Sequence, residues 1–139
     1  MPGPIAATAV SVEPVMTRRV VLVLENIPMS EVATISGRYD YNGFPIISRE
    51  GRLVGVITKG DLLRAARESF RRTGVWDEPV SRWMAHGIVA LRPADSLEAA
   101  ISLMVDHEMR SLPVIDADAR VVGVISRQDL LRALEGVRR

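Results

Sequence analysis

An internal repeat constrains the fold of this chain more than any other feature of its sequence. The stretch GVITKGDLLRA at residues 55–65 returns as GVISRQDLLRA at residues 123–133, an offset of 123 − 55 = 68 residues. The same ungapped shift carries Pro45 onto Pro113, so the repeat extends over most of both halves. Two copies are too few for a solenoid. The repeat therefore predicts two similar lobes packed about a pseudo-two-fold axis.

Each half of the sequence predicts the same order of elements: strand, helix, strand, strand, helix. Short apolar runs at residues 20–24 and 88–91 indicate the first strands, and apolar residues at helical spacing follow each run. Two further strands joined by a tight turn then lead into an amphipathic closing helix. In the first closing helix, the residues predicted to face inward are Leu62, Leu63, Ala66 and Phe70. The predicted fold class is mixed α/β (α+β) with small sheets.

The repeat also predicts where the chain divides. We expect a flexible N-terminal arm over 1–11, a first repeat over 12–70, a connector over 71–80 and a second repeat over 81–139. The stretch 71–87, which is the connector with the start of the second repeat, carries both tryptophans, Trp76 and Trp83. Because large aromatic side chains contribute much of the energy of cores and interfaces, we expect them to pack against the lobes or a second subunit.

The composition narrows the possible classes of function. The chain has no cysteine, so it has no disulfide framework and no thiolate metal site, which fits a cytoplasmic location. Its formal net charge of +1 argues against nucleic-acid binding, which a stronger basic excess would favour. The longest apolar run, residues 20–24, is far shorter than the ~20 residues of a membrane-spanning helix. The N-terminal residues do not have the pattern of a signal peptide.

The start of each closing helix combines a hydroxyl, a cation and an aspartate. These residues are Thr58, Lys59 and Asp61 in the first copy and Ser126, Arg127 and Asp129 in the second. The simplest interpretation is a helix cap, with the hydroxyl at the N-cap and the acid three residues later. However, a cation at the first helical position is unfavourable by ~0.3–1 kcal/mol, and both copies keep one. The alternative is a nucleotide site, where N–H groups and a cation bind phosphate and the aspartate binds ribose hydroxyls.

Three weaker signals each admit a second interpretation. Tyr41 and Phe44 flank an Asn-Gly pair, and they would either form a turn with core aromatics or stack on an adenine ring. Arg110, just before a predicted strand, would either be solvated or hold a phosphate group. Residues 106–108 (Asp-His-Glu) could in principle ligate a metal, but adjacent residues on a helix point in different directions.

Catalytic signatures are missing from the sequence. It contains no phosphate-binding loop, no dinucleotide-binding fingerprint, no nucleophile elbow and no zinc-protease motif. No arrangement pairs an acid and a base with a nucleophile. The sequence therefore predicts a protein that is not an enzyme and that carries no cofactor or metal.

The segments VMT, GFPII and GVITKGDLL, followed by RWMA, SLPVID and GVISRQDLL, resemble a tandem pair of CBS domains, also called a Bateman module. The resemblance implies two β-α-β-β-α repeats and a regulatory protein that binds AMP, ADP, ATP or S-adenosylmethionine in clefts between the repeats. The ligand-binding residues that it implies are Tyr41, Phe44, Pro45, Thr58, Lys59, Asp61, Arg110, Pro113, Ser126, Arg127 and Asp129. Asn42 occupies the position of Arg110 in the first repeat, which departs from the family pattern.

A finer resemblance concerns the first repeat. The segment MSEVATISGRYDYNGFPIIS is similar to the first CBS repeat in the cytoplasmic region of CLC-type chloride channels and transporters, where an aromatic residue at the position of Tyr41 stacks on adenine. The family resemblance also implies a homodimer and an attached or associated effector, for example a membrane transporter. The competing interpretation is a ligand-free dimerisation or interaction module, in which both aspartates serve only as helix caps. Nucleic acid is not an expected partner.

Overall fold

The structure is a computed structural model that describes residues 10–136. The chain divides into two compact units. The first-repeat unit is Val21–Ile88, and the second-repeat unit joins the described residues before Val21 to those after Ile88. Each unit contains helices and a small sheet, which confirms the predicted α+β class.

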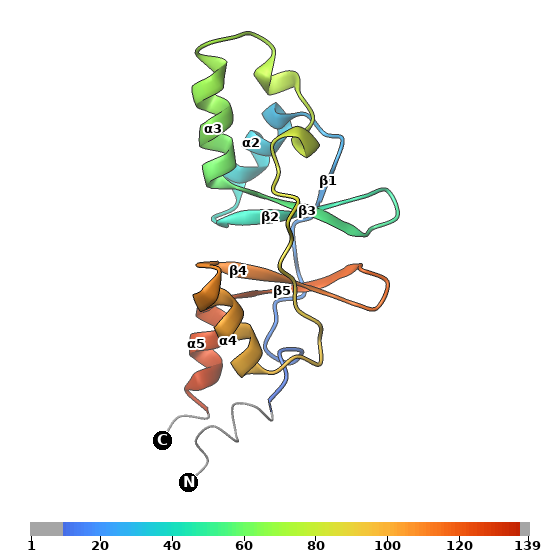
Figure 1. The fold of residues 1–139 in the computed structure, drawn as a ribbon, viewed down its shortest axis with the longest axis vertical. Coiled ribbons are helices and arrows are strands. Elements are labelled where there is room, and N and C mark those ends of the chain that lie inside the picture. The colour runs from blue at the N-terminus through green and yellow to red at the C-terminus, as the bar shows by residue number, and fades with distance from the viewer. Residues whose placement is uncertain (1–9, 137–139) are drawn as a thin grey trace. The chain divides into compact units, whose positions relative to one another are not determined.

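The first-repeat unit has a three-stranded sheet in the order β1-β2-β3, with helices beside it (Figure 1). Its elements are β1 (Val23–Leu24), α2 (Met29–Arg38), β2 (Gly43–Ile47), β3 (Leu53–Thr58), α3 (Lys59–Ser69) and two 3₁₀ turns, η1 (Val75–Asp77) and η2 (Val80–Arg82). β1 is parallel to β2, and β2 is antiparallel to β3. Strands β2 and β3 are apolar because the helices and the connector cover their side chains.

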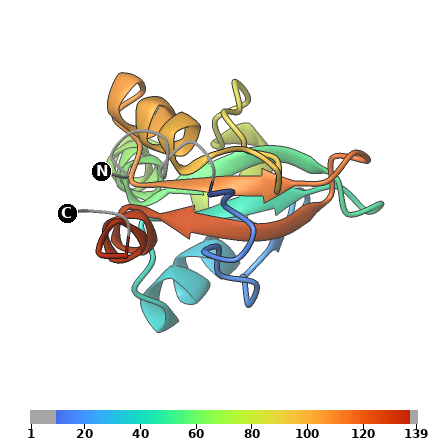
Figure 2. The ribbon, with the colours of Figure 1, turned by 90° about the horizontal axis from the view of Figure 1, so that it is seen from below.

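The second-repeat unit is built on one antiparallel hairpin, β4 (Ser111–Ile115) and β5 (Val121–Ser126), with α4 (Leu97–Asp106) and α5 (Arg127–Leu134). The strand predicted at residues 88–91 is reduced to a single parallel bridge from Leu91 to Val114. Both helices lie at the end of the hairpin opposite its turn (Figure 2). The closing helix α5 therefore starts directly where β5 ends.

The N-terminal segment of each repeat packs on a strand of the other repeat. Thr17 and Val124 exchange backbone hydrogen bonds of 2.8 and 2.9 Å, and Ala85 and Val56 exchange bonds of 2.9 and 3.2 Å. The strand residue beside each crossing is a glycine, Gly123 or Gly55. A Cβ on Gly55 would lie 2.8 Å from the carbonyl oxygen of Ala85, and one on Gly123 would lie 3.0 Å from that of Thr17. Glycine is required at both positions because the crossing backbone approaches so closely.

The connector is part of the first-repeat core. Trp76 and Trp83 are half-buried and pack against the core cluster of that unit, as the sequence predicts. Val75 and Val80, from the two 3₁₀ turns, are fully buried in the same cluster. The connector therefore supplies core residues rather than acting as a free linker.

The inward face of α3 differs from the predicted one. Ala65 is fully buried and Leu62 packs against the core, but Leu63 is 71% exposed and Phe70 is 88% exposed. Leu63 and Phe70 are seven residues apart, so they lie on one side of the helix, and that side faces away from the core. The prediction that these two residues face inward is wrong. Apolar character alone could not tell a core-facing stripe from an exposed one.

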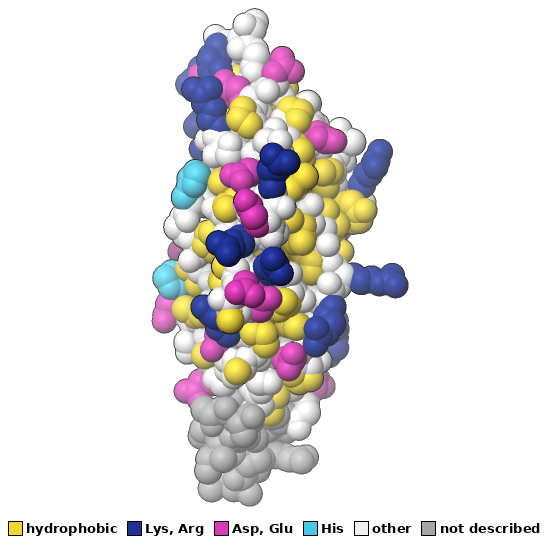
Figure 3. All heavy atoms as spheres, turned by 90° about the vertical axis from the view of Figure 1, so that its right-hand side faces the viewer, with side chains coloured by type: hydrophobic (Ala, Val, Ile, Leu, Met, Phe, Trp, Pro, Cys, Tyr) yellow, Lys and Arg dark blue, Asp and Glu magenta, His cyan; other side chains and the backbone are white. Residues whose placement is uncertain are grey.

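The N-terminal arm expected over residues 1–11 falls mostly outside the described residues. Its last two residues are held in place, because Ser11 bridges to Ser96 and the carbonyl of Val10 accepts a hydrogen bond of 2.9 Å from Leu97 N–H. Within residues 10–136, no helix is long and apolar enough to cross a membrane. On the face shown in Figure 3, basic and acidic side chains of each unit are interspersed with apolar ones. That face therefore presents no continuous basic surface.

Candidate functional site

Both predicted helix starts form complete capping boxes. At α3, Thr58 Oγ1 accepts a 3.2 Å hydrogen bond from Asp61 N–H, and Asp61 Oδ2 accepts one of 2.8 Å from Thr58 N–H. At α5, the corresponding bonds between Ser126 and Asp129 are 3.1 and 3.0 Å long. The capping interpretation is therefore correct for all four residues. Each aspartate uses one carboxylate oxygen for the cap, so the second oxygen is left for other partners.

The cations at the first helical positions have local partners. Lys59 Nζ lies 3.5 Å from Asp40 Oδ1, and Arg127 Nε donates a 2.7 Å hydrogen bond to the carbonyl oxygen of Met109. These contacts offset the unfavourable helix dipole, so the positive charges do not by themselves require a bound anion. Both side chains remain exposed and close to the helix N-termini.

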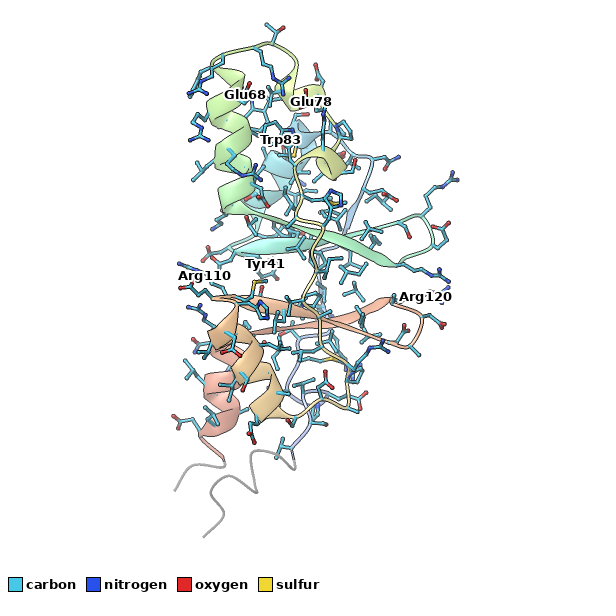
Figure 4. The ribbon with its side chains drawn as sticks, viewed as in Figure 1. Tyr41, Glu68, Glu78, Trp83, Arg110 and Arg120 are labelled. Atoms are coloured by element: carbon cyan, nitrogen blue, oxygen red, sulfur yellow. The ribbon has the colours of Figure 1, made fainter. Side chains whose placement is uncertain are left out.

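The residue that precedes each central hairpin lies beside the helix start of its own unit. The backbone N–H of Lys59 donates to the carbonyl of Asn42, and that of Arg127 donates to the carbonyl of Arg110, both at 3.1 Å. Asn42 and Arg110 are therefore equivalent in structure as well as in sequence. The exposed Arg110 side chain makes no hydrogen bond or ion pair with any residue in 10–136, so it is free to contact an anion (Figure 4).

Tyr41 is one of two exposed members of a group of three aromatic rings. Its ring stacks on Tyr39 with centroids 5.7 Å apart and meets Phe44 edge-on at 5.8 Å. Tyr41 is 43% exposed, whereas Phe44 is 2% exposed and belongs to the first-repeat core. This corrects the prediction that Phe44 offers a stacking face. Tyr39, which the sequence analysis did not single out, extends the exposed aromatic surface instead.

Pro45 and Pro113 occupy equivalent places in the centre of β2 and β4, and both are buried. Their rings are packed inside the strands, so they shape the backbone beside the helix starts rather than offering an exposed side chain. Asp106 ends α4, and His107 and Glu108 follow it. Among residues 10–136, no group of three or more potential metal-ligating side chains comes together.

The surroundings of the two carboxylates differ in ways that the repeat does not predict. Arg64 donates a 2.6 Å hydrogen bond to Oδ1 of Asp61, whose side chain is 13% exposed. The equivalent Arg132 is 3.6 Å from Oδ1 of Asp129, which is beyond hydrogen-bond distance. Oδ2 of Asp129 lies 3.4 Å from the hydroxyl of Thr17. Thr17 lies in the VMT segment and Arg64 in the repeated DLLRA stretch, but neither sequence shows that its side chain reaches the carboxylate.

Comparison with known families decides the classification. The model of the CBS domain matches residues 12–68 and again residues 80–136. The chain belongs to the CBS domain family. Its two CBS repeats account for most of the sequence, which confirms the predicted tandem pair.

Relatives of this CBS pair include both short and long proteins. The CBS domain-containing protein YhcV of Bacillus subtilis is 33% identical over 121 residues, 86% of this chain and 82% of that protein. A homoserine O-acetyltransferase of Methanohalobium evestigatum is 26% identical over 89% of this chain, which spans only 24% of the enzyme's length.

Two solved structures have a similar fold. One is CBSX2, a CBS-pair protein of Arabidopsis thaliana, in complex with AMP. It is 25% identical to this chain with a TM-score of 0.83, and the match covers 94% of this chain and 99% of that chain. The other is the cytosolic domain of the Mg²⁺ channel MgtE in complex with ATP. It is 26% identical to this chain with a TM-score of 0.72, and the match covers 85% of this chain and 46% of that chain.

Proposed function

We propose that this CBS pair is a regulatory module that binds adenosine-containing nucleotides at its two helix starts. The observation that carries the proposal is the duplicated hydroxyl–aspartate pair, in which each carboxylate uses one oxygen for the cap and directs the other away from it. The similar CBSX2 and MgtE structures contain AMP and ATP, which supports an adenine nucleotide as the ligand class.

Each part of a nucleotide has a suitable group in the candidate sites. The second oxygens of Asp61 and Asp129 can accept hydrogen bonds from ribose hydroxyls, and the exposed ring of Tyr41 can stack on adenine. The helix N-termini and the cations Lys59 and Arg127 suit phosphate. Arg110 adds a free guanidinium to the Ser126–Asp129 site, whereas Asn42 adds no charge to the Thr58–Asp61 site.

We infer that the module regulates another protein and catalyses no reaction. The sequence contains no catalytic motif, and the long relatives with enzyme names extend well beyond the segment that this chain matches. The effector is an attached or associated protein, and MgtE supports a membrane channel or transporter as one class. A CLC-type chloride transporter is the specific member that the first repeat suggests. A cytoplasmic location follows from this role.

A homodimer is the proposed assembly. Leu63 on α3 and Leu131 on α5 are equivalent in the repeat, and they are 71% and 62% exposed. In the second-repeat unit, Leu131 and the 69%-exposed Val105 line a mostly apolar groove of about 320 Å³ between α4 and α5. Large exposed apolar side chains at equivalent places favour a surface that a second copy covers.

The second candidate function is a dimerisation module that binds no ligand. The complete capping boxes favour it, because they explain both aspartates without a nucleotide. The two candidates differ in one measurable property, which is whether an adenine nucleotide binds to the folded protein.

Calorimetry and thermal unfolding with AMP, ADP, ATP and S-adenosylmethionine test the proposal. At a concentration of 100 Kd, a ligand that binds only the folded protein stabilises it by about 2.7 kcal/mol. We expect saturable binding of at least one ligand, and weaker binding in Asp129→Ala. If no ligand binds at millimolar concentration, the dimerisation module is the correct function. Hydrolysis of ATP by the pure protein would contradict the non-catalytic role.

A further inference from the structure

We infer that Arg64 competes with the nucleotide for Asp61, so that the two sites fill in sequence: first the Ser126–Asp129 site, then the Thr58–Asp61 site. The inference rests on the proposed function and adds a mechanism of regulation to it. The guanidinium of Arg64 lowers the affinity of the Thr58–Asp61 site for a ribose and leaves that of the Ser126–Asp129 site unchanged.

The hydrogen bonds of Asp61 leave little room for a ribose. A carboxylate has about four lone-pair positions on its two oxygens. Oδ2 of Asp61 accepts bonds of 2.8 and 3.0 Å from the N–H and hydroxyl of Thr58, and Oδ1 accepts the 2.6 Å bond from Arg64. Only one position remains for the two adjacent hydroxyls of a ribose. Arg64 must move before both hydroxyls can bind.

Arg64 is held over Asp61 by Trp83, which follows the connector. Its guanidinium carbon lies 5.8 Å from the ring centre of Trp83, and the same nitrogen that contacts Asp61 also donates a 3.2 Å hydrogen bond to the carbonyl oxygen of Trp83. The indole N–H of Trp83 donates a 3.0 Å hydrogen bond to Glu78, which lies beside it in Figure 4. Glu78 in turn accepts a 2.6 Å bond from Arg72. A continuous chain of contacts therefore fixes the side chain that covers Asp61.

The second repeat contains the arginine but not the residues that hold it. The 68-residue shift places Val15 at the position of Trp83 and Val10 at that of Glu78, and both valines pack against the second-repeat core. Neither valine offers an aromatic ring on which a guanidinium could stack, and neither has a carboxylate like that of Glu78. Arg132 is accordingly 69% exposed at its side chain and lies 3.6 Å from Asp129. Oδ1 of Asp129 therefore keeps its lone pairs for a ligand.

The magnitude of the competition follows from the exposure of Arg64. Its side chain is 52% exposed, so water weakens the ion pair, although Asp61 itself is nearly buried. Pairs of this kind shift equilibria by about twofold to fivefold rather than by orders of magnitude. The affinity of the Thr58–Asp61 site for a ribose should be reduced by that factor.

The test compares Arg64→Met with the matched variant Arg132→Met. Methionine has similar length and helix propensity but no donor, so it can still pack on Trp83. Adenosine is the ligand, because it has no phosphate that Arg64 could bind. Calorimetry should show that Arg64→Met strengthens the weaker adenosine site about twofold to fivefold, or makes a second site measurable. Arg132→Met should match the wild-type protein.

A second variant, Trp83→Phe, keeps an aromatic ring but loses the bond to Glu78. It should shift adenosine binding in the same direction as Arg64→Met, by a smaller factor. Unchanged or weaker adenosine binding in Arg64→Met would overturn the inference. If Asp61→Ala abolishes one wild-type site while Arg64→Met has no effect, only the competition is wrong. If wild-type protein and all variants bind no adenine ligand, the proposed function itself is wrong, and the competition with it.

Discussion

At the scale of single residues, Asp61 and Asp129 each have a structural role and a proposed binding role. Both close a capping box, so replacing either with alanine removes a helix-stabilising contact as well as a ligand contact. Binding changes in these variants must therefore be compared with their stability. Arg110 is a better probe of binding alone, because its side chain makes no hydrogen bond or ion pair with any other described residue.

Arg110→Ala should narrow the preference for AMP over adenosine. A hydrogen bond to a charged group contributes roughly 1.5–3 kcal/mol, and Arg110 is exposed, so we expect about a tenfold loss of AMP affinity. Adenosine affinity should be unchanged. Arg120→Ala is the control, since Arg120 is also exposed but lies beside the β4–β5 turn (Figure 4). Equal AMP binding by wild type and Arg110→Ala would identify Arg110 as an ordinary surface arginine.

At the scale of elements, the crossing segments hold each repeat together. Met84 and Ala85 lie directly on Gly55 of β3, and Met16 and Thr17 lie on Gly123 of β5. These contacts bring the N-terminal segment of one repeat against the core of the other, where Met16 and Met84 are buried. The connector adds a second anchor through Glu78, which binds Arg72 and Trp83.

Gly55→Ala should destabilise the protein by about 1–3 kcal/mol, because the new methyl group would collide with the backbone of Ala85 and the side chain of Met84. Gly37→Ala is the matched control. Gly37 lies in α2 and has nothing within 4 Å of an added Cβ, so alanine should be neutral or stabilise the helix by about 0.5–1 kcal/mol. Urea denaturation measures both changes. If the two variants are equally stable, the crossing segment shifts to accommodate the added methyl group at little cost in free energy.

Acid should weaken the connector anchor. The hydrogen bond from Arg72 lowers the pKa of Glu78 below its ordinary value of 4.5, with further lowering by the Trp83 bond and the nearby arginines. A lowered pKa means that the carboxylate stabilises the folded state above pH 4.5 and that this stability is lost as the pH falls. Glu78→Gln should therefore be less stable at neutral pH and lose less stability between about pH 5 and pH 3. In the control variant Glu50→Gln, at an exposed position, stability should depend on pH as it does in the wild-type protein. The same pH dependence in Glu78→Gln would contradict a stabilising role for the Glu78 carboxylate.

At the scale of the whole molecule, the exposed apolar residues on α3 and α5 bear on assembly. Light scattering of the wild-type protein should give twice the chain mass of 15.3 kDa. The double variant Leu63→Glu/Leu131→Glu should give the single-chain mass, because buried unpaired carboxylates strongly disfavour an apolar interface. Ala117→Glu, in the exposed β4–β5 turn, adds the same type of charge and should remain dimeric. A wild-type mass of one chain over a wide concentration range would contradict the dimer.

The sequence alone determined the tandem organisation, the order of most elements and both capping boxes. These features are local or repeated: a cap involves four neighbouring residues, and two copies in register confirm each other. Periodicity could not decide which apolar side of α3 faces the core, so Leu63 and Phe70 were assigned wrongly. The short strand at residues 88–91 was overestimated for a similar reason, since apolar character does not guarantee a pairing partner.

Only the tertiary structure decided how the two helix starts differ. Arg64 and Trp83 are 19 residues apart, and they meet because the connector folds back onto α3. Thr17 and Asp129 are 112 residues apart, and they meet because the N-terminal segment crosses onto β5. The repeat predicts equivalent carboxylates, but what reaches their oxygens depends on Trp83 and Thr17, which differ from their counterparts Val15 and Ala85. Hydrogen bonds act over about 3 Å in space, whatever the separation along the chain, so these contacts leave no pattern in the sequence.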